Sequence, residues 1–359
     1  MKSGRHIIFR LDASVVIGTG HLMRCLSLAD ALRQRGANAA FIMRCDAAGM
    51  RDEVQKEMLT RGHACHFLPA PTEGADWRDD AQQTLLCLQD LPRPDCLVVD
   101  HYGLDARWEN MLRPAVSRVM AIDDLADRLH DCDILLDQNF NDDMTTRYAA
   151  LVPAYCQQLL GPRFSMLRPE FIAARANARE RDGAVRRLAV FFGGTDPGGE
   201  TVKALTAIDQ LRKSSPQFTG LACDVIVGGA NPQRALVEQL CDAIPEVYFH
   251  CQINDMARVM AAADLCIGAG GTALWERAVL GVPSLVTSVA DNQVSASVAM
   301  AREGALLYLG SAASLDVEGL QQALAFALGN PWLLISLARR SAELVDGEGL
   351  ARVVACIDP

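Results

Sequence analysis

The sequence contains no run of about 18 apolar residues, which argues against a transmembrane helix. Its first stretch, "MKSGRHIIFRLDAS", lacks the apolar core of a signal peptide, so we expect a cytoplasmic protein. An excess of positive charge is also missing. The net charge of −10 argues against partners such as nucleic acid or an anionic membrane surface. A local anion site stays possible, because backbone amides can form one.

Paired cysteine spacing is absent as well. The 12 cysteines are scattered over 359 residues without a Cys-x-x-Cys pair. Such cysteines are typical of small core side chains rather than of a disulfide framework. The cluster His63-Ala64-Cys65-His66 has no second ligand pair at zinc spacing. We therefore expect neither a metal site nor a cofactor.

Chain length and patterning predict two domains. Short apolar runs alternate with helical periodicity, which is typical of parallel sheets covered on both faces. Strands are predicted at 6–13, 38–44, 63–68, 95–102, 118–125, 132–139, 186–196, 222–231, 247–253, 263–271 and 283–289, and helices at 21–36, 50–61 and 199–212. The predicted fold class is α/β, with two doubly wound domains facing a cleft. We expect an N-terminal domain over 1–165, a charged linker over 166–185 and a C-terminal domain with a helical tail over 186–359.

Glycine-rich turns follow several predicted strands, where ligands bind in open parallel sheets. In "GAGGTALWE" (268–276), Gly270 and Gly271 let a ligand approach the backbone, and Thr272 is placed to cap the next helix. Glu276, one turn further on, suits the two hydroxyls of a ribose. The alternative is a tight turn with a solvated glutamate.

Two further turns are less specific. "FFGGTD" (191–196) places Gly193 and Gly194 after a strand, as a second anion site or as a plain strand-to-helix turn. "GTGH" (18–21) is not a G-x-G-x-x-G motif and has no acidic residue at dinucleotide spacing. It is either part of a functional loop or a turn with an exposed histidine.

His21 opens a predicted helix, whose positive end disfavours imidazolium and leaves a neutral base. Asp12 and Ser14 precede it on the same loop and are candidates to orient the ring. Two more polar clusters follow strands, Asp100-His101-Tyr102 and Asp291-Asn292-Gln293. Each offers the hydrogen-bonding groups that a sugar requires, or is an ordinary polar loop.

Taken in order, seven segments resemble the UDP-sugar hydrolases of the bacterial pseudaminic acid pathway. They are "RLDASVVIGTGHLMRCLSLADAL", "VVDHYGLDARWE", "IDDLADRLHDCDILLDQN", "LLGPRFSMLRPEF", "FFGGTDP", "IGAGGTALWERAVLGVPSLV" and "DNQ". The similarity runs from about residue 6 to about residue 310. The G-x-G-H-x-x-R-C and G-G-x-x-x-W-E strings are its most specific parts.

The resemblance implies a GT-B fold of two Rossmann-like domains, with UDP held mainly by the C-terminal domain and the sugar by the N-terminal loops. It implies that His21 is the base that activates water. Because UDP can leave as an anion held by backbone amides, a metal is not strictly needed. The resemblance assigns Arg168 and Glu276 to the substrate and Tyr102 and Asn292 to its sugar. From their places in the loops, we further expect substrate contacts at Asp12, Ser14, Gly18, Gly20 and Arg24. We expect UDP contacts at Gly193, Gly194, Gly270, Gly271 and Thr272, beside Glu276.

The implied activity is hydrolysis of a UDP-linked 2,4-diacetamido-2,4,6-trideoxy sugar at the anomeric carbon with inversion. The alternatives are a glycosyltransferase of the same fold, a hydrolysing epimerase and a non-catalytic UDP-sugar-binding protein. The oligomeric state is open.

Overall fold

The computed structural model describes residues 4–13, 20–45, 48–71 and 73–358. Backbone contacts divide the chain into two compact units. The first comprises Met1–Arg168 and Glu348–Pro359, and the second comprises Pro169–Gly347. Each contains one parallel sheet with helices packed against it, so the prediction of two Rossmann-like α/β domains is confirmed.

The sheet of the first unit has the strand order β3-β2-β1-β4-β5-β6-β7, and all its pairs are parallel. Its central strands are almost entirely buried, as expected for apolar strands covered on both faces. The strands are β1 (His6–Ala13), β2 (Asn38–Cys45), β3 (Ala64–Phe67), β4 (Cys96–Asp100), β5 (Val119–Ile122), β6 (Ile134–Asp137) and β7 (Gln157–Leu160).

Alternate side chains of this sheet face two different sets of helices. Phe9 packs with α1 (Gly20–Gln34), α2 (Ala48–Arg61) and α13 (Gly349–Ile357). Its neighbour Ile8 packs with α3 (Trp77–Gln89) and α4 (Ala106–Leu112) on the other face. Two short 3₁₀ turns, η1 (Arg113–Ala115) and η2 (Pro162–Phe164), complete the unit.

The sheet of the second unit has the order β10-β9-β8-β11-β12-β13 and is also parallel. The strands are β8 (Arg187–Phe191), β9 (Ala222–Val227), β10 (Val247–Cys251), β11 (Leu265–Ala269), β12 (Ser284–Ser288) and β13 (Leu307–Ser311). The helices are α5 (Pro169–Ala176), α6 (Glu200–Ser214), α7 (Arg234–Ala243), α8 (Met256–Ala262), α9 (Ala273–Val279), α10 (Val294–Arg302), α11 (Val317–Leu328) and α12 (Pro331–Leu344), with 3₁₀ turns η3 (Pro216–Phe218), η4 (Asp291–Gln293) and η5 (Ala312–Ser314).

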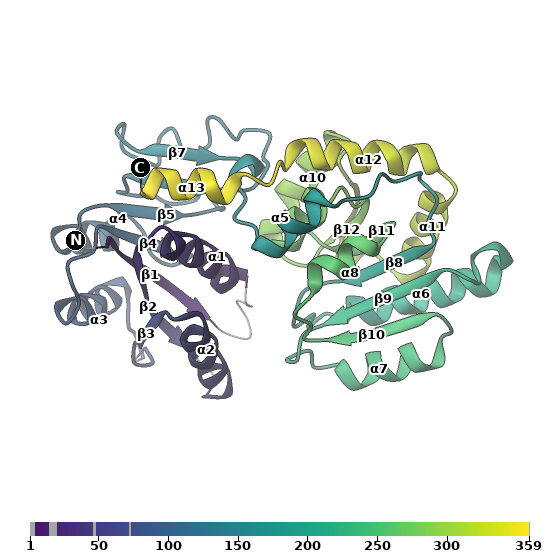
Figure 1. Ribbon diagram of the computed structural model, residues 1–359, viewed down its shortest axis with the longest axis horizontal. Helices are drawn as coiled ribbons and strands as arrows, with labels where there is room; N and C mark the ends of the chain where they lie inside the picture. The colour runs from purple at the N-terminus through teal and green to yellow at the C-terminus, as the bar shows by residue number, and fades with distance from the viewer. Residues whose placement is uncertain (1–3, 14–19, 46–47, 72, 359) are drawn as a thin grey trace. The chain divides into compact units, whose positions relative to one another are not determined.

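The unit boundaries differ from the predicted ones at two places. The expected linker 166–185 contains α5, which contacts α8 and α9 of the second unit. The end of the expected C-terminal tail belongs to the first unit. There α13 lies beside α1 (Figure 1). Val353 and Ile357 of α13 join the core of the first unit, and the Ile357 carbonyl accepts a 2.9 Å hydrogen bond from Arg5. The apolar face of an amphipathic helix predicts burial but does not identify the surface that buries it.

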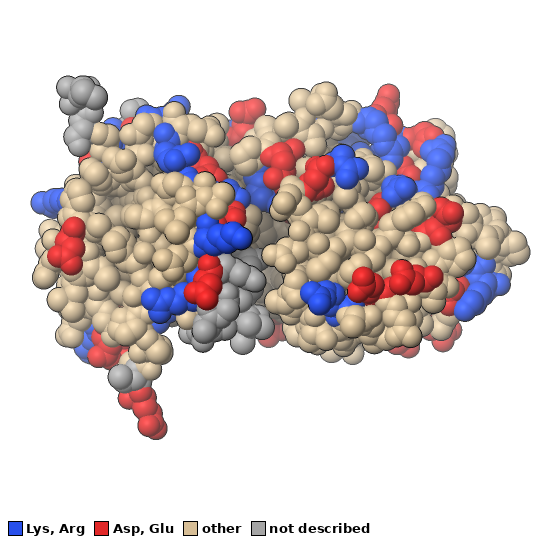
Figure 2. All heavy atoms as spheres, turned by 60° about the horizontal axis from the view of Figure 1, so that its bottom comes forward, with Lys and Arg blue, Asp and Glu red and all other residues tan. Residues whose placement is uncertain are grey.

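Of the helices in the described part of the chain, none is both long and apolar enough to cross a membrane. On the face that Figure 2 shows, the described acidic and basic side chains are interspersed, and neither sign of charge dominates a broad region.

Candidate active site

The strand order of the first sheet reverses between β1 and β4, because β2 and β3 continue on one side and β5 to β7 on the other. Ligands of open parallel sheets bind beyond the carboxyl ends of the strands at such a point. Asp100 is the last residue of β4 and pairs with Leu11 of β1. The helix α1, which follows β1 in the chain, begins at Gly20. This topology brings His21 next to Asp100.

The side chains of His21 and Asp100 form a close pair. The Nδ1 atom of His21 lies 2.6 Å from Oδ1 of Asp100, and the two residues are only 8% and 1% exposed. The edge of the Tyr102 ring meets the imidazole at 90°, with 4.8 Å between the centroids. Because an ionised carboxylate only accepts, Nδ1 carries the proton and donates it to Asp100. The remaining nitrogen, Nε2, is then the proton acceptor of a neutral histidine.

Arg24 donates two hydrogen bonds to the same carboxylate. Its Nε donates to Oδ2 of Asp100 at 2.6 Å, and its Nη2 donates to Oδ1 at 2.5 Å. The thiol of Cys25 also lies 3.4 Å from Oδ2. Burial alone would raise the pKa of Asp100. The charge of Arg24, with the hydrogen bonds from Arg24 and His21, outweighs burial and holds that pKa well below its usual range. Asp100 is therefore an anion at neutral pH.

Asp12, which the sequence suggested as the group that orients His21, is engaged elsewhere. Its Oδ1 accepts from Arg10 and, at 3.0 Å, from the backbone N–H of Arg44, while its Oδ2 lies 3.0 Å from Nε2 of His101. Asp12 thus joins the ends of β1, β2 and β4. The orienting group is Asp100, which the sequence analysis placed only in a polar cluster. Ser14 and Gly18 lie outside the described residues.

Tyr102 and Asp124 extend this polar cluster toward β5. The Tyr102 hydroxyl donates to Oδ2 of Asp124 at 3.4 Å, and the same oxygen lies 3.8 Å from Nη1 of Arg24. Burial, followed by the charge of Asp124, raises the pKa of Tyr102, so its hydroxyl remains a donor at neutral pH. The expected sugar contact at Tyr102 therefore lies beside the expected base.

The second sheet has its own reversal of strand order, between β8 and β11. Gly193 and Gly194 follow β8, and Gly270 and Gly271 follow β11, so both predicted glycine turns lie at the favoured edge of this unit. Asn292 lies in η4 after β12 and is half-buried. Arg168 is the last residue of the first unit and is also half-buried.

The turn after β11 differs in detail from the expected anion site. The N–H of Gly270 donates to Oε1 of Gln293 at 3.2 Å, and the N–H of Val289 donates to the same oxygen at 3.1 Å. A Cβ at Gly270 would lie 2.3 Å from Oγ of Ser297, which explains the glycine. The amide of Gly270 is thus already occupied by a side chain.

Two other expectations at this turn have mixed outcomes. Thr272 makes no side-chain capping hydrogen bond to α9, because its own backbone is already helical (φ −51°, ψ −35°). The capping role predicted for Thr272 is therefore wrong. Glu276 in the first turn of α9 is buried, which rules out the alternative of a solvated glutamate.

In the turn after β8, a carboxylate of the turn itself binds the backbone N–H groups at the start of the next helix. The two carboxylate oxygens of Asp196 accept from the backbone N–H groups of Glu200 and Thr201 at 3.0 and 2.8 Å, at the start of α6. The N–H of Gly228 donates to the carbonyl of Gly194 at 3.0 Å, so this turn also packs against the turn after β9. These contacts favour the plain structural turn over a second phosphate site.

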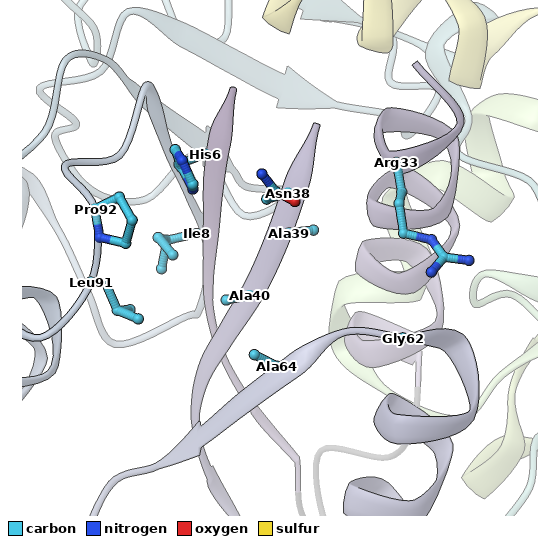
Figure 3. Close-up of a pocket in the computed structure, with 10 residues that line it drawn as sticks. All are labelled: His6, Ile8, Arg33, Asn38, Ala39, Ala40, Gly62, Ala64, Leu91 and Pro92. Atoms are coloured by element: carbon cyan, nitrogen blue, oxygen red, sulfur yellow. The ribbon is translucent and has the colours of Figure 1, made fainter. Parts of the chain in front are cut away.

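A pocket of about 230 Å³ lies away from these residues. Figure 3 shows His6, Asn38 and Ala64 around it, and these are the first residues of β1, β2 and β3. It therefore opens at the amino edge of the first sheet, opposite the edge that carries His21. Throughout residues 4–13, 20–45, 48–71 and 73–358, no three His, Cys, Asp or Glu side chains are grouped as metal ligands.

Comparison with protein families finds no family model that matches. Among curated proteins, the spore coat polysaccharide biosynthesis protein SpsG of Bacillus subtilis is 33% identical over 197 residues, 55% of this chain and 57% of that protein. The uncharacterised protein MJ1062 of Methanocaldococcus jannaschii is 22% identical over 77% of this chain and 54% of its own length. The chain thus spans little more than half the length of these two relatives.

A third relative is covered almost completely. The UDP-2,4-diacetamido-2,4,6-trideoxy-beta-L-altropyranose hydrolase of Campylobacter jejuni is 22% identical over 299 residues, 83% of this chain and 97% of that protein. Among solved structures, MurG of Acinetobacter baumannii has a TM-score of 0.66 at 16% identity, over 98% of this chain and 99% of that one. Arabidopsis thaliana UGT89C1 complexed with UDP-L-rhamnose has a TM-score of 0.62 at 14% identity, over 99% of this chain and 100% of that one.

At these identities the structural likeness shows the fold alone. Together with the two parallel sheets, it defines a GT-B-like protein. Within that class, the Campylobacter hydrolase, to whose family the sequence motifs pointed, is similar to this chain over 83% of its length at 22% identity.

Proposed function

We propose that this protein is a UDP-sugar hydrolase, in which His21 activates water and Asp100 orients His21. The observation that carries the proposal is the 2.6 Å contact between Nδ1 of His21 and Oδ1 of Asp100 at the carboxyl edge of the first sheet. It leaves Nε2 as the proton acceptor, which is the arrangement that a general base requires. A buried His–Asp pair also has a purely structural use, so the relationship to the Campylobacter hydrolase is the second support.

In the proposed reaction, the oxygen of water attacks the anomeric carbon while Nε2 of His21 takes its proton. The bond between that carbon and the diphosphate oxygen breaks, and its electron pair leaves with UDP. The free sugar appears with inverted configuration. UDP departs as an anion, because a terminal phosphate has a pKa of about 6, and so needs less protonation than the alkoxide of an ordinary glycoside.

The two parts of the substrate are assigned to different loops. We assign the sugar to the polar cluster around Tyr102 and Asp124, where hydroxyl and carboxylate groups are close together. We assign UDP to the second unit, with buried Glu276 near the ribose and Gly271 near the diphosphate. Structural neighbours that bind UDP or UDP-L-rhamnose support a UDP-sugar. The relationship to the Campylobacter hydrolase supports UDP-2,4-diacetamido-2,4,6-trideoxy-β-L-altropyranose as substrate. With the resemblance of the sequence motifs, we assign the reaction to pseudaminic acid synthesis.

A second candidate is transfer of the sugar to an acceptor hydroxyl, with the same histidine as base. The fold similarity to the calicheamicin glycosyltransferase CalG4 and to the glycosyltransferase WaaG favours it. The two functions differ in what replaces UDP at the anomeric carbon. In the hydrolase it is water, and in the transferase it is an acceptor that must be present for turnover.

The test is proton NMR and mass spectrometry of the protein with this UDP-sugar in ¹⁸O-water, without acceptor. The hydrolase predicts UDP release, ¹⁸O on the free sugar and first appearance of the inverted anomer. Label on UDP would mean attack at phosphorus and would contradict the mechanism. Turnover only after an acceptor is added would establish the transferase. A product with changed configuration at C2 would indicate an epimerase.

A further inference from the structure

We infer that Arg24 is a positioning residue of this site. It fixes the orientation of the Asp100 carboxylate and keeps it ionised, and Asp100 in turn orients His21. The inference rests on the proposed role of His21 as base. Its geometric basis is the two-point contact of Nε with Oδ2 and Nη2 with Oδ1, at 2.6 and 2.5 Å. No other pairing in the cluster fixes both carboxylate oxygens at once through one side chain, within the contacts of the described residues.

Arg24 was expected to contact substrate, and its surroundings argue against that role. The side chain is 5% exposed, and its planar fork is matched to a carboxylate that is 1% exposed. Such bidentate pairs are among the strongest and most directional in proteins. A substrate phosphate would have to displace Asp100 to use the same donors, and that would release His21.

The placement of Arg24 follows from helix geometry. It lies three residues after His21 on α1, and residues at this spacing share a helix face. Both side chains therefore point to the end of β4, where Asp100 is the last residue. The Nη2 atom of Arg24 also lies 3.3 Å from Nδ1 of His21, so the three side chains form one compact group.

The charge of Arg24 has a separate effect from its geometry. The groups that face His21 are Asp100 and Tyr102 from the end of β4, Asp124 from the end of β5, and Arg24 on its own helix. The charge of Arg24 helps to keep Asp100 ionised, so that both carboxylate oxygens stay acceptors for Arg24 and for Nδ1 of His21.

These two effects predict different results for two substitutions. Arg24→Lys keeps the charge but loses the two-point contact with Asp100, so kcat should fall about 10- to 100-fold with KM unchanged. Arg24→Gln loses both the charge and the contact, so kcat should fall further, again with KM unchanged. UDP affinity should be unchanged in both, because UDP is assigned to the second unit.

A double-substitution cycle tests whether Arg24 acts through Asp100. In an Asp100→Asn background, Arg24→Gln should have little further effect on kcat. Equal losses in both backgrounds would overturn the inference, and so would a raised KM with unchanged kcat. The matched control is Arg61→Gln. Arg61 pairs with Asp30, which also contacts a histidine, His63, so it removes a similar Arg–Asp–His arrangement elsewhere in the unit.

Two NMR measurements do not depend on turnover, and the first of them needs only the wild-type protein. In the wild-type protein, the Nε–H of Arg24 should be protected from solvent exchange before and after the UDP-sugar is added. Loss of that protection on binding would assign Arg24 to substrate and contradict the inference. The ¹⁵N chemical shifts of the His21 ring report its tautomer if wild-type turnover is absent. The Nδ1–H tautomer should be partly lost in Arg24→Gln, and wild-type shifts in both variants would contradict the inference. Without wild-type turnover, the proposed function fails and the positioning role is still decided.

Discussion

The Nδ1 atom of His21 lies 2.6 Å from the Oδ1 atom of Asp100, although 79 residues separate them in the sequence. The contact exists because β1 and β4 are neighbours in the first sheet, so the residues that follow one strand meet the end of the other. The contact fixes the tautomer of a histidine at the start of a helix, as the proposed role of His21 as base requires.

Asp100→Asn tests the orienting role of this carboxylate. An asparagine has one acceptor oxygen, whereas Asp100 offers two to the donors on His21 and Arg24. We therefore expect the proton of the His21 ring to be no longer fixed on Nδ1. Loss of a comparable orienting carboxylate costs about 10⁴-fold in a serine protease, and we expect kcat to fall by about 10²- to 10⁴-fold. The measurement is steady-state UDP release, with UDP affinity determined separately.

The chain contains a matched control for this substitution. Asp30 lies 2.7 Å from Nε2 of His63 and also pairs with Arg61, in the same unit but along α1 from His21. Asp30→Asn should leave kcat unchanged. Similar kcat losses in Asp30→Asn and Asp100→Asn would mean that the effect of Asp100 is only on folding.

A buried carboxyl at the end of β6 predicts a pH-dependent stability. Burial, together with the nearby Asp124 and Asp123, raises the pKa of Asp137 to about 7, despite the Asn139 N–H and the Arg147 charge that oppose the change. The unfolded chain loses this proton near pH 4, whereas the folded chain keeps it until near pH 7. Asp137 therefore lowers the free energy of unfolding as pH rises from about 4 to about 7, by at most about 4 kcal/mol.

Asp137→Asn should remove this contribution. Urea unfolding of both proteins at pH 5 and pH 8 should show the variant gaining stability relative to wild type at the higher pH. A difference between the two proteins that is the same at both pH values would show that Asp137 does not titrate in this range.

Gly270→Ala tests the turn after β11. The new Cβ would lie 2.3 Å from Oγ of Ser297, so the turn must shift, and Gln293 would lose its hydrogen bond from the Gly270 N–H. We expect UDP affinity to fall by about tenfold or more, since about 1.4 kcal/mol is enough for that. Isothermal titration with UDP measures the change.

Adding Ser297→Gly to Gly270→Ala removes the clashing oxygen and should restore part of the affinity. Gly220→Ala is the control, because a Cβ there meets nothing within 4 Å. Wild-type UDP affinity in Gly270→Ala alone would contradict the assignment of UDP to this turn.

Cys132 and Cys156 are the thiols for which we predict cross-linking. Their sulfur atoms are 3.6 Å apart, and Cys156 is half-buried whereas Cys132 is buried. A hydrogen bond from Cys132 lowers the pKa of Cys156, which makes its thiolate the reactive partner. With diamide, which takes up the two hydrogens, the first disulfide should join these residues. Peptide mapping identifies it, and prior cross-linking of another pair would contradict the prediction.

The central strands of both sheets could be predicted from the sequence because they are continuous apolar runs, as at 6–13 and 118–125. The helix α3 was missed, although Asp76 and Asp79 form a capping box at its start. The assignment of α13 to the first unit could not be predicted, because it depends on which surface its apolar face meets.

The candidate base was predictable from its position after a glycine loop at the start of a helix. Its partner Asp100 was not singled out, because the pairing depends on strand order, and only the sheet places β4 beside β1. The capping role of Thr272 was predicted from residue type alone. The backbone angles that decide a cap are set by the path of the turn, and here Thr272 already has helical angles before α9 begins at Ala273.

The most direct test of the central claim is the turnover of His21→Gln at saturating UDP-sugar, measured beside its affinity for UDP. Glutamine keeps a similar size but cannot take the proton from water. Loss of a general base predicts a fall in kcat of about 10²- to 10⁴-fold with unchanged UDP affinity. Turnover near the wild-type value, in a variant that binds UDP normally, would show that His21 is not the base.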